Sequence, residues 1–375
     1  MKNSLNINTD PYFINFIKGR KLSKSSEIVY IGRLRSFCEF LGKNPSELIK
    51  EAQKEGGLKT DEYFHEYIEN LKKRGKSSNT IINRVDTVKA FYNEYNIDIT
   101  NINHIISPET DKLIHNQIIS QDQIKEALEL SSLRDKAIIL LHLSSGMEAT
   151  ELRYLTYGDF INSIEEYIDL NSEDKFNVNE IANKLSKIDT VVGTWKIEKN
   201  RIRKPYVTFN SPESTKAILS YLIDRERKNK PIKSLKDPLF VNSQNRALNV
   251  SAHGSIFKRV NDRSNFGYLT KKRRFFSSTM LRKYFKTKLN ESEVDETVIN
   301  AFLGQKLNID HYSDAKIKFL KDKYSDALMN LSIEKTDIET VTSEEYKNLI
   351  KKLNEKDKEL EEIKKHLNHI KQIIE

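Results

Sequence analysis

Apolar side chains recur at helical spacing through the first hundred residues. Three stretches carry such a stripe, formed by Tyr30, Leu34, Phe37 and Leu41, by Phe64, Tyr67, Ile68 and Leu71, and by Ile81, Val85, Val88, Phe91 and Tyr95. Intervals of three and four residues place these side chains on one face of an α-helix. Serine-rich N-cap signals at 23–26 and 77–80 precede the first and third stretches. The pattern predicts a helical bundle over residues 1–100.

The pattern changes between residues 101 and 117, where Pro108 and many polar residues predict a linker. Helical periodicity resumes at 121–130 and 133–143, and beyond residue 159 it loosens into polar sequence. Segments 190–197 and 204–209 then read as two paired strands. Further helices are expected at 214–227 and 253–260. Residues 118–335 are therefore expected to form a second domain that is mainly α with a small β-hairpin.

The last forty residues carry a heptad repeat. Its seam positions alternate spacings of three and four and are Tyr346, Leu349, Leu353, Lys356, Leu360, Ile363, Leu367, Ile370 and Ile374. This pattern predicts a coiled coil over residues 336–375 and with it a homo-oligomer. Lys356 at the seam favours weak or specifically registered pairing. A single helix that folds back onto its own domain is the alternative.

Composition favours an anionic partner and a reducing compartment. The 375 residues include 63 Lys and Arg against 54 Asp and Glu, for a formal net charge of +9. The single cysteine, Cys38, excludes an internal disulfide and is expected in the core. The longest strongly apolar run, 137–141, is too short to span a bilayer, and neither metal-ligand spacing nor a glycine-rich phosphate loop occurs. A cytoplasmic protein with no membrane anchor, cofactor or metal is expected.

Several short motifs of the second domain follow one another in a telling order. They are Ser145-Gly146-Met147-Glu148-Ala149-Thr150-Glu151-Leu152 with Asp159, then Thr279-Met280-Leu281-Arg282, then Leu303-Gly304-Gln305, and last His311-Tyr312. In this order the chain resembles the tyrosine recombinase (phage integrase) family. The N-terminal bundle resembles the family's SAM-like core-binding domain, and residues from about 118 to 330 resemble its catalytic domain. The resemblance implies a two-domain clamp on double-stranded DNA.

The resemblance also implies roles for individual residues. Enzymes of this family cleave DNA by attack of a tyrosine hydroxyl on a backbone phosphate, which leaves a 3′-phosphotyrosine link. Tyr312 occupies the place of this nucleophile, with Tyr324 as the alternative. Lys199 best fits the lysine that protonates the leaving oxygen, with Lys204 second. Arg282 fits one of the two arginines that hold the non-bridging phosphate oxygens.

Three slots depart from the family pattern. Glu148 stands where the first arginine is expected, and Thr279 and Gln305 stand in two histidine slots. Loss of one oxyanion donor typically costs about 2.7 to 4 kcal/mol, and a carboxylate in its place should cost more. Thr279 can donate a hydrogen bond but cannot act as a general base near neutral pH, and Gln305 has no titratable proton. The sequence therefore leaves open whether the protein is an enzyme.

Basic and polar side chains suited to DNA lie in several loops and at one helix start. Phosphate contacts are expected from Lys21, Lys76, Arg201, Lys271, Lys272 and Arg273, and contacts to phosphate or base edges from Asn79, Thr80, Asn83 and Arg84. Any one basic run can be a solvated face. Four such basic runs in one chain, at 18–21, 72–76, 199–204 and 271–274, favour a footprint on DNA.

Two functions follow from these observations. The first is a DNA-binding protein with a recombinase fold and a decayed active centre, which serves an architectural or regulatory role on DNA. The second is an active integrase that exchanges strands with altered groups, or one into which the change at position 148 was introduced. The three altered slots favour the first, and the retained Arg282 and Tyr312 favour the second. A coiled-coil scaffold explains the tail but not the ordered motifs.

Overall fold

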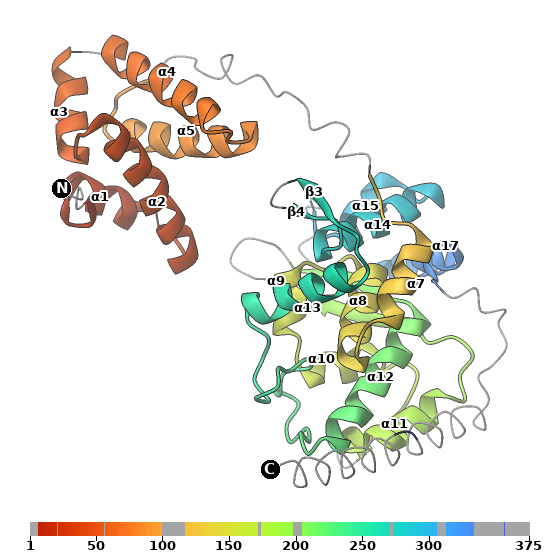
Figure 1. Ribbon diagram of the computed structural model, residues 1–375. Helices are drawn as coiled ribbons and strands as arrows, with labels where there is room; N and C mark the ends of the chain where they lie inside the picture. Colours follow the sequence, from red (N-terminus) through yellow and green to blue (C-terminus); the bar gives the residue numbers. More distant parts are fainter. Residues whose placement is uncertain are drawn as a thin grey trace, which may run out of the picture. The chain divides into compact units, whose positions relative to one another are not determined.

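A computed structural model of the chain (Figure 1) describes residues 7–20, 22–55, 57–99, 117–171, 174–197, 205–270, 273–305, 313–333 and 356. The chain divides into two compact units, Met1–Asn116 and Gln117–Glu375. Each unit has its own hydrophobic core, so each is described by itself. The expected coiled coil lies outside the described residues apart from Lys356. None of the described helices has both the length and the apolar character that a membrane span requires.

The first unit is a helical bundle, as expected. Its elements are η1 (Ile7–Thr9), α1 (Pro11–Gly19), α2 (Lys24–Leu41), α3 (Pro45–Glu55), α4 (Gly57–Lys73) and α5 (Ser78–Asn93). Side-chain oxygens of Asp10, Ser23 and Ser77 cap α1, α2 and α5. The helices α1 and α3 were not among those expected from the sequence. Both are short and begin at a proline, whose fixed φ suits the first helical position.

Aromatic rings fill the core of this bundle. The Phe37 ring centroid lies 5.4 Å from that of Phe64 and 5.1 Å from that of Tyr67, which is typical of packed aromatic pairs. Cys38 is completely buried in the same core, which confirms its expected position. Burial raises the pKa of its thiol to about 12. The thiol therefore remains protonated and inert at neutral pH.

The second unit opens with six helical elements. They are α7 (Gln121–Glu129), α8 (Leu133–Ser145), α9 (Ala149–Tyr154), α10 (Tyr157–Ser163), η3 (Asp174–Phe176) and α11 (Val178–Leu185). The sequence reading of loose polar chain beyond residue 159 was wrong at α11. In this helix Val178, Ile181, Ala182 and Leu185 are buried along one face. Eight residues give too short a periodic signal to stand out among polar neighbours.

A β-hairpin follows. Strands β1 (Gly193–Ile197) and β2 (Tyr206–Asn210) pair antiparallel, with Gly193 opposite Asn210 and Ile197 opposite Tyr206. The remaining elements are α12 (Pro212–Arg227), α13 (Val250–Arg263), β3 (Tyr268–Thr270), β4 (Arg273–Arg274), α14 (Ser278–Glu291), α15 (Glu296–Phe302), α16 (Asp314–Asp326) and α17 (Leu328–Leu331). The expectation of a mainly α fold with a small sheet is confirmed. The second pair, β3 with β4, was not foreseen.

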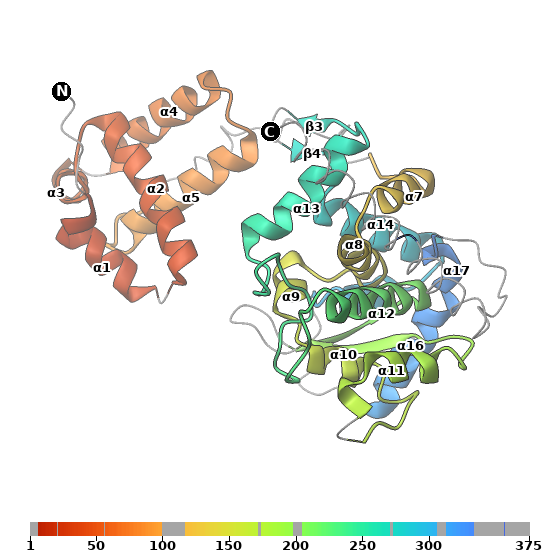
Figure 2. The ribbon, with the colours of Figure 1, turned by 60° about the horizontal axis from the view of Figure 1, so that its bottom comes forward.

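Helix α8 is the centre of this unit (Figures 1 and 2). Every residue from Ala137 to Ser145 is buried, and the helix packs against α12, α14 and β2. It ends at Gly146, whose positive φ of 64° suits glycine. The buried helix thereby fixes the position of the turn that carries Glu148.

Candidate active site

Arg282 lies between the C-terminal ends of two helices. It belongs to α14, which begins after the N-cap Ser277. Its Nη1 donates to the Gly146 carbonyl, and its Nη2 donates to the Leu303 carbonyl at 2.8 Å. Gly146 and Leu303 are the C-cap residues of α8 and α15. The guanidinium thus pairs carbonyls at two helix ends, and the negative ends of both helix dipoles stabilise its charge.

Glu148 faces the same guanidinium. It is the N-cap residue of α9, and its backbone N–H donates to Glu151 Oε2 at 2.7 Å. Its Oε1 lies 3.9 Å from Arg282 Nη2, and the Arg282 and Glu148 side chains are 15% and 36% exposed. At this distance, and with Glu148 partly open to solvent, the ion pair adds little to stability. Its chemical effect is larger, because the carboxylate offsets the positive charge that a phosphate oxyanion would require.

Thr279 and Gln305, the two histidine slots, both lie near Arg282. Thr279 is close to it in sequence, and Gln305 follows a residue that Arg282 binds. Thr279 is exposed in the first turn of α14, three residues before Arg282, so both project from neighbouring positions of one helix. Gln305 is exposed two residues beyond Leu303, the acceptor for Arg282, and its N–H donates to the Asn300 carbonyl at 2.8 Å. Neither side chain can replace a histidine as a general base.

A buried tyrosine and carboxylate support the turn at Glu148. The Tyr206 hydroxyl donates to Glu151 Oε2 at 2.6 Å, the same oxygen that accepts the Glu148 N–H. The Tyr206 ring also lies against Gly304, where an added Cβ would stand 2.7 Å from Cδ1. Tyr206 thus connects the Glu148 turn to the Leu303–Gly304 turn. Sequence reasoning took Glu151 as structural but missed Tyr206, which looked like an ordinary strand residue.

Tyr324, the alternative for the nucleophile, is a core residue. It is completely buried, and its hydroxyl donates to the Ser144 carbonyl at 2.8 Å. Its ring packs against Phe209, Phe285 and Phe302. Burial raises its pKa well above the ordinary value, which disfavours the phenolate. Tyr312, the first choice for the nucleophile, lies outside the described residues, as do His311, Lys199 and Lys204.

Two buried histidines, His142 and His253, contact each other next to the turn that carries Glu148. His142 Nδ1 lies 3.0 Å from the Met147 carbonyl, and the Nε2 atoms of His142 and His253 are 2.9 Å apart. Burial, and for His142 also the neighbouring His253, lowers their pKa values to about 3 and about 4. Both rings are neutral at physiological pH and are covered from solvent. Their separation by 111 positions explains why no spacing in the sequence revealed the pair.

The expected DNA contacts of the first unit have mixed placements. Asn79 and Asn83 are exposed on α5, and the Asn83 amide donates to the Asn79 carbonyl at 2.7 Å. The Thr80 hydroxyl lies 2.9 Å from that of Ser77 in the N-cap, and Lys76 is half-buried just before it. Arg84 instead donates into the bundle, to Ser36 Oγ at 2.5 Å and to the Tyr67 hydroxyl at 3.3 Å. These bonds occupy part of the guanidinium that was expected to reach DNA.

Arg273 of the second unit is exposed in β4. Four further candidates, Lys21, Arg201, Lys271 and Lys272, lie outside the described residues. Within the described parts of the chain, no three His, Cys, Asp or Glu side chains are arranged to hold a metal ion. The described site thus consists of one tethered arginine, one opposed carboxylate and two neutral polar residues.

Comparisons with known proteins identify a family and a shared fold. The phage integrase family matches residues 116–309, whereas no curated protein matches the chain. A structure of the Tn1549 transposon integrase in complex with a circular intermediate DNA is 14% identical, with a TM-score of 0.52, and covers 83% of this chain and 97% of its own. A lambda integrase dimer bound to a core site is 11% identical, with a TM-score of 0.50, and covers 82% and 92%. At these identities the likeness concerns the fold.

The family match spans more than half of the chain and includes the Glu148 turn, Arg282 and the Leu303–Gly304 turn. The structural neighbours share the helical fold that brings these segments together. The chain therefore belongs to the phage integrase family, the tyrosine recombinases.

Proposed function

We propose that this protein binds double-stranded DNA, that its strand-transfer activity is impaired or lost, and that it acts on DNA in an architectural or regulatory role. Structural neighbours solved as DNA complexes and the net charge of +9 support the DNA partner. They also favour a DNA-associated location in the cell.

The contact between Glu148 and Arg282 carries the argument for impaired catalysis. Phosphoryl transfer to a tyrosine builds negative charge on the non-bridging oxygens, and a second cation is expected where Glu148 stands. The carboxylate lies 3.9 Å from the one arginine that remains. A phosphate at Arg282 would meet this negative charge. Removing one oxyanion donor costs about 2.7 to 4 kcal/mol, which alone slows the step by two to three orders of magnitude.

Recovery of covalent protein–DNA adducts under denaturing conditions tests this proposal. The full chain is mixed with sheared genomic DNA, beside Glu148→Gln and Glu148→Arg. The unchanged protein should yield few adducts and Glu148→Arg many more, with Glu148→Gln between them. Asp169→Asn is the matched control, because it removes one exposed carboxylate in the loop after α10 and should change nothing.

Adding Tyr312→Phe to Glu148→Arg should abolish the adducts and identify the linking residue. The proposal fails if the unchanged protein forms abundant adducts that Glu148→Gln does not increase. That result would favour the second candidate, an active integrase. The observation behind this candidate is that Arg282 is already held in place by two carbonyls.

The heptad at 336–375 supports a homo-oligomer, and a scaffold role for it is the weaker alternative. Sedimentation of the full chain and of a chain ending at residue 335 tests this part. The same number of chains per particle for both would contradict a homo-oligomer held by the heptad segment.

A further inference from the structure

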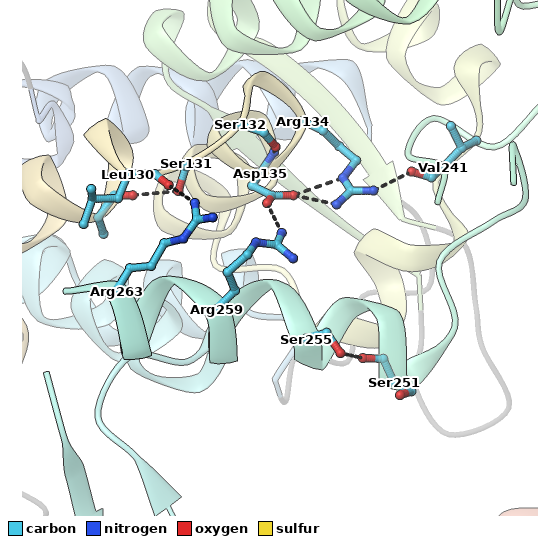
Figure 3. Close-up of polar contacts among 11 residues, drawn as sticks. Leu130, Ser131, Ser132, Arg134, Asp135, Val241, Ser251, Ser255, Arg259 and Arg263 are labelled. Atoms are coloured by element: carbon cyan, nitrogen blue, oxygen red, sulfur yellow. Dashed lines mark hydrogen bonds and ion pairs between the residues drawn. The ribbon is translucent and has the colours of Figure 1, made fainter. Parts of the chain in front are cut away.

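Helix α13 is amphipathic and presents a polar face. Its buried residues are His253, Ile256, Phe257, Val260 and Asn261. Its exposed polar face consists of Ser251, Ser255, Lys258, Arg259, Asp262 and Arg263. Figure 3 shows four of these side chains following one another along the helix, with Arg259 directed toward Asp135 and Arg263 toward Leu130. The face carries three cations and one carboxylate, which suits an anionic partner.

A buried carboxylate holds one of these cations. Asp135, in the first turn of α8, is only 1% exposed. Its Oδ1 accepts from Arg134 Nε at 3.0 Å and from Nη2 at 2.9 Å, and its Oδ2 accepts from Arg259 Nη2 (Figure 3). A buried charge is tolerated when it is paired in this way. Two guanidiniums on one carboxylate leave a local charge of +1.

Arg134 and Arg259 differ in how many of their N–H donors are already used within the protein. Arg134 is also bound through Nη1 to the Val241 carbonyl at 3.0 Å. Among the described residues, Arg259 bonds to Asp135 alone, and its side chain is 41% exposed. A guanidinium has five N–H donors in a rigid plane, so a bond at one edge orients the other edge. Arg259 therefore has a fixed inner edge and an open outer edge.

We infer that Asp135 is a positioning residue that presents Arg259 to a pair of acceptor oxygens or nitrogens on DNA. The acceptors are two phosphate oxygens or the O6 and N7 of a guanine, both of which match a bidentate arginine. This inference rests on the proposed DNA binding. It adds that a buried carboxylate 124 positions away in the chain determines how well Arg259 binds.

Simple electrostatics predicts the opposite effect for Asp135, which makes the test sharp. Asp135→Asn makes the protein more positive by one charge, so charge alone would strengthen binding to DNA. Positioning predicts that binding weakens, by about tenfold, because an asparagine amide has one acceptor oxygen in place of two and cannot hold both Arg134 and Arg259. Arg259→Lys keeps the charge but loses the fork, and it should weaken binding by a similar factor.

The experiment measures anisotropy of a labelled random-sequence duplex over a salt series, with the full chain. Lys258→Ala is the matched control for Arg259→Ala, since both remove one exposed cation from neighbouring positions of α13. Arg259→Ala should weaken binding more. The double variant Asp135→Asn with Arg259→Lys should bind no more weakly than Arg259→Lys, because Asp135 acts through Arg259. Selection of preferred sequences with the unchanged protein and with Arg259→Ala then separates the two acceptors. Loss of a guanine contact relaxes the preference for one base, whereas loss of a phosphate contact weakens binding to all sequences alike.

Each outcome is decisive. If the unchanged protein does not bind duplex, the proposed function fails and the inference fails with it. If it binds but Asp135→Asn binds equally or more tightly, only the inference is overturned. Should Asp135→Asn not fold, Arg259→Lys decides, and affinity equal to that of the unchanged protein overturns the positioning role.

Discussion

His142 and His253 hold complementary tautomers. The Met147 carbonyl can only accept, so His142 Nδ1 carries a proton and donates to it. The neutral His142 ring then has an acceptor at Nε2, and His253 Nε2–H donates to this atom across 2.9 Å. A chain of two hydrogen bonds, with every donor pointing the same way, thus runs from His253 of α13 through His142 of α8 to Met147, the residue before Glu148. A proton added to either ring would place two N–H groups against one another or bury a charge.

The histidine pair should make stability depend on pH. Both folded-state pKa values, about 3 and about 4, lie below the ordinary value of 6.5. The stabilisation is therefore complete above pH 6.5 and is lost as pH falls toward the folded values, because the unfolded chain takes up protons first. Through this pair, the free energy of unfolding should change by up to about 2.7 kcal/mol per pH unit. Urea unfolding followed by the fluorescence of Trp195, the single tryptophan and a buried one, measures it.

His253→Gln is the informative variant for this slope. A glutamine amide can still donate to His142 Nε2 but does not titrate. The dependence between about pH 6.5 and pH 5 should fall by roughly half. An unchanged slope in this window would show that other groups cause it.

Arg282→Ala should destabilise the second unit by about 3 kcal/mol, apart from any effect on chemistry. The substitution removes a charged donor from the Gly146 and Leu303 carbonyls. Arg273→Ala, which removes an exposed arginine from β4, should stay within about 0.5 kcal/mol of the unchanged protein. Equal unfolding midpoints for the two variants, measured through Trp195, would argue against the tethering role.

Tyr324→Phe should cost about 1 to 2 kcal/mol, since it leaves the buried Ser144 carbonyl without its donor while the ring packing is kept. It should leave the yield of covalent adducts unchanged in the Glu148→Arg background. Loss of adducts without loss of stability would contradict the structural assignment of this residue.

Gly146→Ala should be far more harmful than a typical glycine substitution. An added Cβ would stand 2.4 Å from Phe285 Cδ1, and the backbone has a φ of 64°. We expect the free energy of unfolding to fall by more than about 2 kcal/mol, and the residue 146 carbonyl that accepts from Arg282 to move. At Gly254, within α13, a Cβ meets no described atom inside 4 Å, so Gly254→Ala should gain up to about 1 kcal/mol. Thermal unfolding that ranks the two variants in reverse would refute the steric argument.

The sequence predicted what depends on neighbours along the chain. Periodic stripes and serine caps located the long helices α2 and α5, and the ordered motifs located Glu148 and Arg282. The contacts that define the site could not be predicted in this way. Tyr206 meets Glu151 across 55 positions, and Arg259 meets Asp135 across 124. Such pairs obey no period, because tertiary packing alone brings them together.

Nor could the sequence tell that Tyr324 is buried. Its neighbours along the chain resemble those of Tyr312, and its burial comes from packing against Phe209, Phe285 and Phe302. Arg84 gives the same lesson, since its bonds to Ser36 and Tyr67 come from two other helices.

The burial of Cys38 has a practical consequence. The only thiol of the chain is buried in the first unit and protonated at neutral pH, so it should not react with maleimides or disulfide reagents. A cysteine placed at an exposed site such as Ser251 would then be the sole attachment point for a dye, a spin label or a cross-linker. The native protein thus already offers the silent background that other proteins gain only after their own cysteines are removed.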